Sequence, residues 1–276
     1  MKIVLKKIAK FFNRHPFAYF VRYLLFSQNA KENNLGDLGC FNEFNSLASI
    51  PPLYFEINTK IGIDPMLNEY DKAIQIGTYL RNSMKGGPGI GLSSQKTLEI
   101  MVANKGGVCS DFSQIFNIFC FINGIKVKEW GCIDRFYKSE FGHSFNEIYV
   151  TVLQKWVAID IHKGFVFSNE LNSKLSVVEM FTTLRASNPV NFAHYSSYVS
   201  PDIERTSKVY SSKTIPFIIS NNRIDVTDYY FNKFQNSISP LFINAIILAL
   251  RKNHKFIFVM DNYKLKLLPE SIQKLR

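Results

Sequence analysis

The sequence predicts an α+β fold in which a helix that begins at a cysteine packs on an antiparallel sheet. Two observations lead to this fold class. Up to residue 124 the apolar residues recur at helical spacing, and beyond it they alternate with polar residues, as in half-buried strands. Two of the alternating runs are joined by a tight turn at Gln154-Lys155, which predicts a hairpin and hence antiparallel pairing. The 276 residues, 46% of them hydrophobic, suffice to bury a sizeable core.

The first third of the chain is predicted to begin and end in helices. Leu5, Ile8 and Phe12 lie on one stripe of an amphipathic helix that ends near His15-Pro16, and a second helix follows through residues 20–25. Residues 34–63 are rich in turn formers and are expected to be irregular. Asp64-Pro65 is a typical helix start, so a further helix is expected to run to about Met84.

A cysteine-led helix is the central element of the prediction. The stretch GGPGIGLSS (residues 86–94) interrupts the preceding helix, and Ser93 or Ser94 then caps a short helix that stops at residues 104–106. After Gly106-Gly107 a helix is expected from Cys109 to Asn123-Gly124, with a wide apolar face.

Strands are expected to dominate the rest of the chain. The alternating runs are residues 125–133, 143–153 and 155–161, and a helix is predicted over residues 175–186. Two more hairpins are expected at 215–226 and 255–268, turning at Asn-Asn and Asp-Asn, with a helix over Leu241–Leu250 between them. We predict a helical extension over residues 1–63, a catalytic core over 64–190 and a C-terminal α+β extension over 191–276.

Charge and cysteine usage narrow the classes of partner. The net charge is +6 over residues 1–33 and +5 over 251–276, so residues 34–250 are neutral overall. A neutral centre argues against a basic nucleic-acid groove, and we expect no specific nucleic-acid binding. Because apolar and basic faces coincide in residues 1–33, that segment allows at most a weak contact with a membrane surface.

The four cysteines are too sparse for a disulfide scaffold, and no pair has the CxxC spacing of a zinc site. We therefore expect no metal and no organic cofactor. Lysines interrupt the N-terminal apolar run, which makes it a poor signal peptide, and Leu241–Leu250 is far shorter than a membrane-spanning helix. These features favour a soluble, cytoplasmic protein with reduced thiols.

Three residues in order form a candidate catalytic constellation. Cys109 stands at a predicted helix start, where the helix dipole and a nearby imidazolium favour the thiolate. His143 begins the predicted strand 143–153, and Asp160 lies near the end of the predicted strand 155–161. A hairpin of these two strands would bring the two side chains side by side. His143 would then act as base and acid, and Asp160 would orient the imidazole. Taken alone, Cys109 fits a core thiol equally well, and His143 fits a surface residue better.

This segment, from about Ser94 to Gly164, resembles the core of the transglutaminase-like superfamily. The resemblance lies in the GVC helix start, the HSFNE strand at 143–147 and the WVAID strand at 156–160. It implies a papain/transglutaminase-like fold with N- and C-terminal additions. It also implies a thiol enzyme with Cys109 as nucleophile, His143 as base and acid, and Asp160 as orienting carboxylate. Arylamine N-acetyltransferases share a similar Gly-Gly turn, but in this chain the cysteine follows that turn too soon.

The chain departs from the family pattern where the oxyanion would be stabilised. Family members often carry an aromatic or amide side chain before the cysteine, and both tryptophans of this chain lie after it. Gln95 and Tyr79 are weak candidates for that role. Asp111 and Glu147 are candidate supporting residues, although helix capping and surface exposure are equally good interpretations. His162 is expected at a strand end in solvent.

The predicted function is cleavage or transfer of an amide or ester acyl group through a Cys109 acyl-enzyme, with a peptide, a protein or a small amide or ester as substrate. Two alternatives stay open. One is an inactive binding module that keeps the fold, and the other is an arylamine N-acetyltransferase-like acyltransferase.

Overall fold

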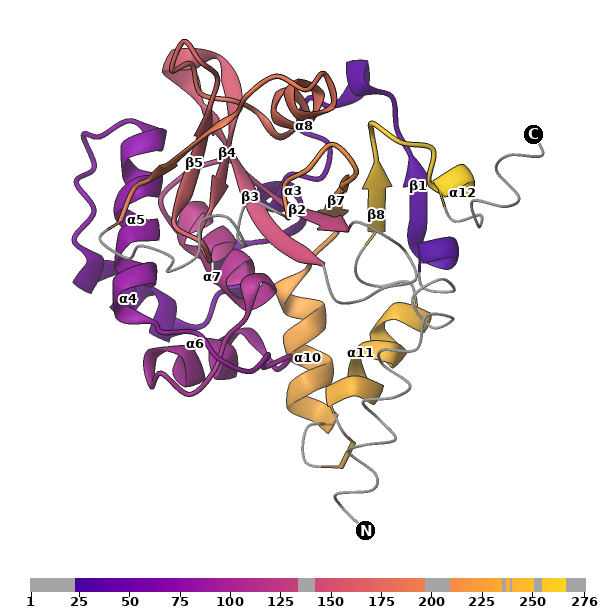
Figure 1. The fold of residues 1–276 in the computed structure, drawn as a ribbon. Coiled ribbons are helices and arrows are strands. Elements are labelled where there is room, and N and C mark those ends of the chain that lie inside the picture. The colour runs from indigo at the N-terminus through magenta and orange to yellow at the C-terminus, as the bar shows by residue number, and fades with distance from the viewer. Residues whose placement is uncertain are drawn as a thin grey trace.

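Eight strands of the described residues form one mostly antiparallel sheet. The structure is a computed structural model that describes residues 23–133, 142–196, 209–234, 237–238, 240–250 and 255–266. The strands lie in the order β1-β8-β7-β2-β3-β4-β5-β6, and all neighbours are antiparallel except β1 and β8 (Figure 1). They are β1 (Ser27–Asn29), β2 (Val127–Ile133), β3 (His143–Val150), β4 (Lys155–Asp160), β5 (Phe165–Ser168), β6 (Asn191–His194), β7 (Ile215–Ser220) and β8 (Lys255–Phe258).

Helices cover both faces of this sheet, which confirms the predicted α+β class (Figure 1). Apolar side chains of α4, α5, α6 and α7 share one core with the sheet, and those of α8 share a second core on the opposite face. The helices are α3 (Phe41–Phe44), α4 (Pro52–Ile61), α5 (Glu69–Ser83), α6 (Ser94–Val102), α7 (Cys109–Ile122), α8 (Val177–Arg185), α10 (Ile224–Phe234), α11 (Pro240–Ala249) and α12 (Tyr263–Lys266).

The predicted hairpin is present. β3 and β4 pair from Val150↔Lys155 to Asn146↔Ile159, around a short 3-10 turn at Thr151–Leu153. Ile148 of β3 and Val157 of β4 point into the core beneath α7, as the pattern requires. Helix α7 begins at Cys109, as predicted, and packs on β2 and β3.

The stretch of residues 34–63 is not irregular, because it contains α4. Pro52 occupies the first helical position, where a missing N–H costs nothing, and Gly62 ends the helix in the left-handed conformation at φ 66°. The next helix starts at Glu69, four residues after the predicted first helical residue Pro65. Asn68 provides its cap by accepting the Asp71 N–H at 3.0 Å, whereas Asp64 closes only a local turn.

Neither predicted C-terminal hairpin forms in the described residues. The strand β7 is followed by α10, whose buried Ile224 and Phe231 are seven residues apart on one helical stripe. The strand β8 is followed by α12, because the Asn262 side chain accepts the N–H groups of Lys264 and Leu265 and caps a helical turn. The predicted helix over Leu241–Leu250 is present as α11.

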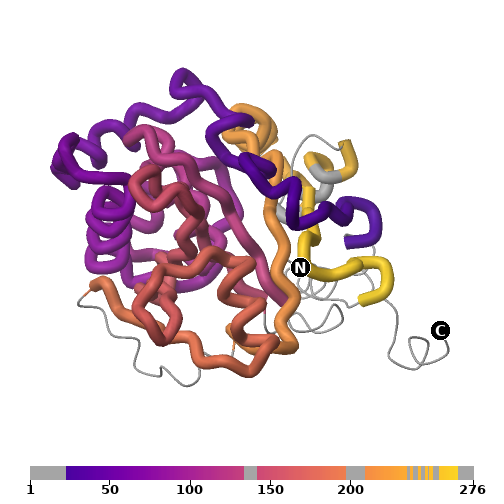
Figure 2. The backbone as a smooth tube through the Cα atoms, turned by 90° about the horizontal axis from the view of Figure 1, so that it is seen from above, coloured from indigo at the N-terminus to yellow at the C-terminus, as the bar shows by residue number. Residues whose placement is uncertain are grey.

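Segments from both ends of the chain complete the sheet. β7 pairs with β2, β8 pairs with β7, and β1 lies beside β8, so the indigo and yellow segments run side by side in Figure 2. The division predicted at residues 63 and 190 stays a prediction, and strands from all three predicted parts lie in this sheet.

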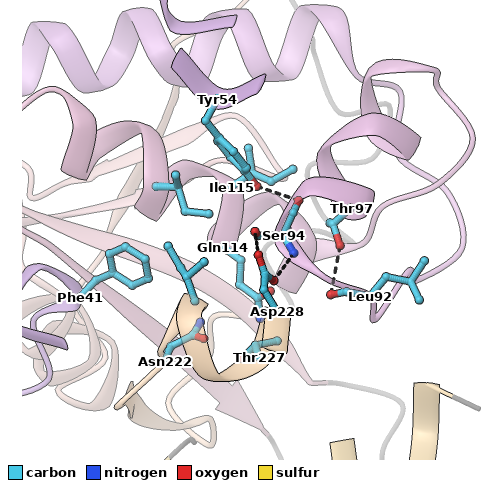
Figure 3. Close-up of a pocket in the computed structure, with 12 residues that line it drawn as sticks. Phe41, Tyr54, Leu92, Ser94, Thr97, Gln114, Ile115, Asn222, Thr227 and Asp228 are labelled. Atoms are coloured by element: carbon cyan, nitrogen blue, oxygen red, sulfur yellow. Dashed lines mark hydrogen bonds between the residues drawn. The ribbon is translucent and has the colours of Figure 1, made fainter. Parts of the chain in front are cut away.

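A carboxylate from α10 caps helix α6 from outside. Asp228 Oδ1 accepts the Ser94 N–H at 2.7 Å, and its Oδ2 binds the Ser94 hydroxyl (Figure 3). Of the two predicted caps, Ser93 occupies the cap position but makes no side-chain cap bond, and Ser94 is the first residue of the helix. Tyr54 donates to the Ser94 carbonyl at 3.1 Å, so α4, α6 and α10 meet around a small pocket that Gln114 of α7 also lines.

The predicted helix at residues 5–12 lies outside the described residues, whereas residues 23–26 are helical as expected. Within the described part of the chain, no helix combines the length and apolar character needed to cross a membrane.

Candidate active site

Two glycines set the position of Cys109 at the start of α7. Gly107 has φ +118°, a region that side chains rarely adopt, and a Cβ there would lie 3.0 Å from Met101. A Cβ on Gly106 would lie 2.9 Å from the Pro88 carbonyl oxygen. The backbone of Gly107 is in turn paired with residues 87 and 88 by bonds of 2.8 and 2.9 Å. Larger residues would break this pairing, so the glycines let the chain turn sharply into the helix.

Asp111 locks the first turn of α7 from within. Its Oδ2 accepts the Val108 N–H at 2.9 Å and the Ile90 N–H at 3.2 Å. The first bond satisfies an orphan donor at the helix start, and the second ties the glycine-rich loop to it. Asp111 is buried and its bonds are to backbone N–H groups, so it acts on the position of Cys109 rather than on a substrate.

The hairpin brings His143 and Asp160 together. Continuing the β3–β4 register by one residue sets Asp160 opposite Phe145, two residues from His143 on the same face. The Nε2 of His143 lies 2.8 Å from Oδ2 of Asp160, and both side chains are almost fully buried. This spacing is a charge-assisted hydrogen bond when the imidazole is protonated.

Cys109, at the start of α7, is the third residue of the cluster. Its half-buried thiol lies close enough to the His143 side chain and to the Ser144 N–H for both groups to lower its pKa. Because Nε2 of His143 faces Asp160, Nδ1 is the ring nitrogen that remains for the sulfur. The structure therefore brings together all three residues of the predicted constellation.

The electrostatics of the cluster favour a thiolate and an imidazolium. Burial raises the pKa of the Cys109 thiol, but the charge of His143 and the hydrogen bonds from His143 and Ser144 outweigh it and hold the pKa below its ordinary value. Burial lowers the pKa of His143, yet the charges of Asp160 and Cys109 raise it well above its ordinary value. Burial alone would raise the pKa of Asp160. The charge of His143 and its hydrogen bond outweigh burial, so the pKa of Asp160 lies below its ordinary value.

Asp160 has further partners that the sequence pattern does not reveal. Its Oδ2 accepts the Tyr210 hydroxyl at 2.7 Å, and its Oδ1 accepts the Lys163 N–H at 3.0 Å. Tyr210 is 50 residues away in a stretch without periodicity, so no local signal marks it. The buried carboxylate is satisfied on both oxygens, which holds it in one orientation.

The proposed supporting residues lie in different places. Glu147 accepts the Trp130 Nε1–H at 2.9 Å and the Val177 N–H at 2.8 Å, so it joins β3 to the start of α8. Gln95 is exposed on α6 and donates to Glu99. Tyr79 packs against the core below α7. Among the described residues, no hydrogen bond joins Gln95 or Tyr79 to Cys109.

His162 lies beside the cluster, contrary to the expectation of a solvent-facing strand end. Its ring centroid is 6.0 Å from that of His143 and 5.3 Å from that of Phe112, and its Nδ1 is buried without a hydrogen-bond partner. Burial lowers the pKa of His162 to about 3, and the charge of His143 adds to this effect. His162 is therefore a neutral wall of the site at pH 7.

A further buried carboxylate, which the sequence did not indicate, lies behind α7. Glu129 on β2 accepts from Asn117 of α7 at 3.3 Å and from Asn222 at 3.1 Å. Asn146 of β3 donates to Asn117 at 2.8 Å and to the Ser113 carbonyl at 3.1 Å. This polar network fixes α7 against the sheet.

No cluster of three or more metal-ligating side chains occurs among the described residues.

An oxyanion beside Cys109 would meet the backbone N–H groups of the first helical turn, which lack intrahelical partners.

The comparisons with known proteins agree with this geometry. The family model described as the transglutaminase-like superfamily matches residues 59–161, which include Cys109, His143 and Asp160. The comparison with curated proteins finds no match.

Proposed function

We propose that the transglutaminase-like superfamily domain of this chain, residues 59–161, is a cysteine-dependent acyl-transfer domain that acts on amide or ester carbonyls. The observation that carries the proposal is the contact of Cys109 with a buried imidazole that Asp160 holds at 2.8 Å. These are the parts of an activated nucleophile: a thiol, a base and a group that orients the base.

Acylation begins from the ion pair. The Cys109 thiolate attacks the carbonyl carbon, a C–S bond forms, and the carbonyl π electrons move to the oxygen. The N–H groups at the start of α7 and the positive end of its dipole face that negative charge. The imidazolium of His143 then donates its proton to the leaving nitrogen or oxygen, the bond to carbon breaks, and a thioester remains on Cys109.

Deacylation reverses the roles. Neutral His143 takes a proton from water or from an amine as it attacks the thioester, and the Cys109 thiolate leaves. Asp160 keeps the imidazole in one tautomer and orientation throughout, because its Oδ2 already accepts from Nε2. Water as acceptor gives hydrolysis and an amine gives transfer.

An acyl-enzyme is the direct test. We expect p-nitrophenyl acetate to give a burst of p-nitrophenol equal to the enzyme concentration, with acetyl found on Cys109 by peptide mass spectrometry. Cys109→Ala should abolish both while leaving the circular dichroism spectrum unchanged. The buried Cys40, Cys120 and Cys132 serve as internal controls, because they should remain unmodified.

Three outcomes would contradict the proposal or favour one of its alternatives. If Cys109→Ala keeps the full burst, or if acetyl appears on another residue, the thiol mechanism is wrong. If Cys109 is not acylated and titrates as an ordinary thiol near pKa ~8.5, the inactive binding module is favoured instead. Acetyl transfer from acetyl-coenzyme A to an arylamine would favour the N-acetyltransferase-like alternative.

A further inference from the structure

One oxygen of Asp160 serves two donors. Oδ2 lies 2.8 Å from His143 Nε2 and 2.7 Å from the Tyr210 hydroxyl, while Oδ1 accepts the Lys163 N–H. Asp160 is fully buried and Tyr210 is only 4% exposed, so water does not compete for these bonds.

The ring of Tyr210 is fixed in place by other aromatic rings. Its centroid lies 5.4 Å from Phe145 at 87° and 5.0 Å from Phe167 at 68°, both edge contacts. It also meets the His143 ring edge-on, with centroids 5.9 Å apart. The backbone beside it is held by Thr214, whose hydroxyl donates to the Val209 carbonyl at 2.9 Å. The phenol is therefore aimed at Asp160 before any substrate binds.

We propose that Tyr210 is a positioning residue of the Cys109–His143–Asp160 site, supplied by the chain beyond the matched family segment of residues 59–161. The inference rests on the proposed function. Tyr210 acts through Asp160, to which its hydroxyl donates. Its donation holds the carboxylate in the orientation that His143 needs and favours the ionised form.

Other charged or titratable groups also face Asp160. His143 comes from β3, His162 follows β4, Cys109 starts α7, and Tyr210 comes from the segment before β7. Tyr195 directs its hydroxyl to the backbone carbonyl of Asp160 at 3.4 Å instead of the carboxylate. Tyr195 is thus a matched control, a partly buried phenol nearby that does not bind the carboxylate.

The test measures the alkylation rate of Cys109 by iodoacetamide from pH 3 to 9. Wild-type protein should show an acid midpoint well below that of a free thiol. In Tyr210→Phe the Asp160 carboxylate loses a donor and protonates at higher pH, which weakens the imidazolium and moves this midpoint up by about one unit. Tyr195→Phe should leave the midpoint unchanged. Phe keeps the ring, so a packing role alone predicts no shift.

A second variant strengthens the same hydrogen bond instead of removing it, and its result does not depend on whether Tyr210→Phe folds. Placing 3-fluorotyrosine at position 210 keeps the ring and makes the hydroxyl a stronger donor, so the midpoint should move down. Midpoints equal to wild type for the fluorinated protein and for folded Tyr210→Phe would overturn the role of Tyr210 and leave the acyl-transfer proposal standing. A wild-type thiol that titrates ordinarily would overturn both.

Discussion

At the scale of single residues, the candidate site depends on charges that stabilise one another in a buried place. Cys109, His143 and Asp160 would each be disfavoured as an isolated ion there, because burial opposes charge. Their three charges alternate in sign, so each charge makes ionisation of the neighbouring group more favourable. The properties of Cys109 therefore depend on both partners.

Replacing Asp160 by Asn should expose this dependence. The charge of Asp160 holds the pKa of His143 above its ordinary value, so Asp160→Asn lowers that pKa. The imidazolium is then lost at lower pH, and the alkaline limb of the p-nitrophenyl acetate profile should move down. Turnover should fall on the order of 10⁴-fold, because the imidazole also loses its orientation. Stopped-flow rates from pH 5 to 10 measure both effects.

The matched control is Asp225→Asn, which removes an exposed carboxylate that forms an ion pair with Arg223. It should leave the profile unchanged. An Asp160→Asn protein with the wild-type alkaline limb would show that the carboxylate does not support the imidazolium.

At the scale of elements, the turn before α7 decides where the sulfur lies. Gly107 adopts φ +118° against Met101, and its backbone is paired with the loop at residues 87–88. A side chain at this position must accept strain, move Met101, or unpair the loop. Each of these changes acts on the backbone that leads into the first turn of α7.

Gly107→Ala should therefore lower both stability and reactivity. We expect a loss of about 1–3 kcal/mol of unfolding free energy, typical of a residue held in a sparsely populated backbone region. Urea unfolding measures it, and the alkylation rate of Cys109 should fall in parallel. Gly36→Ala is the control, because a Cβ at Gly36 meets nothing within 4 Å and its φ is not positive. Equal stability of the two variants would show that the turn tolerates a side chain.

Elements with a local pattern were predictable, and elements fixed by distant partners were not. The β3–β4 hairpin and α7 follow from alternation and helical spacing, because their apolar faces are buried over many residues. The start of α5 was misplaced since Asp64 and Asn68 are both good caps, and only packing selects the second. The helix α10 was mistaken for a strand because Asn221-Asn222 matches a hairpin turn; instead, the Asn222 side chain binds Glu129 of β2.

The site divides in the same way. Cys109, His143 and Asp160 could be selected because their residue types suit one reaction and occur in order. Tyr210 and Glu129 could not, because each is recognised only by a partner that folding brings close. Burial converts an ordinary tyrosine and an ordinary glutamate into parts of the site, and the sequence alone carries no sign of that burial.

At the scale of the whole molecule, Glu129 joins parts of the chain that are far apart. Asn117 of α7 and Asn222 after β7 both donate to its Oε2, so the carboxyl links α7 to the sheet and to the C-terminal third. Burial, opposed by those hydrogen bonds, raises its pKa from 4.5 to about 8. Glu129 is thus protonated in the folded protein at pH 7 and ionised in the unfolded chain.

This difference makes the stability of the whole protein depend on pH. The folded protein binds one proton more than the unfolded chain between pH 4.5 and about 8, so the contribution of Glu129 is complete below that window and is lost as the pH rises through it.

Glu129→Gln cannot ionise, so its unfolding free energy relative to wild type should increase by more than about 1.4 kcal/mol from pH 5 to pH 8. Urea unfolding at pH 5, 6.5 and 8 measures that difference. Glu99→Gln changes a surface glutamate of α6 and should give no such increase. Parallel stability curves for wild type and Glu129→Gln would mean that Glu129 stays ionised in the folded protein, which would require the two asparagine donors to outweigh its burial.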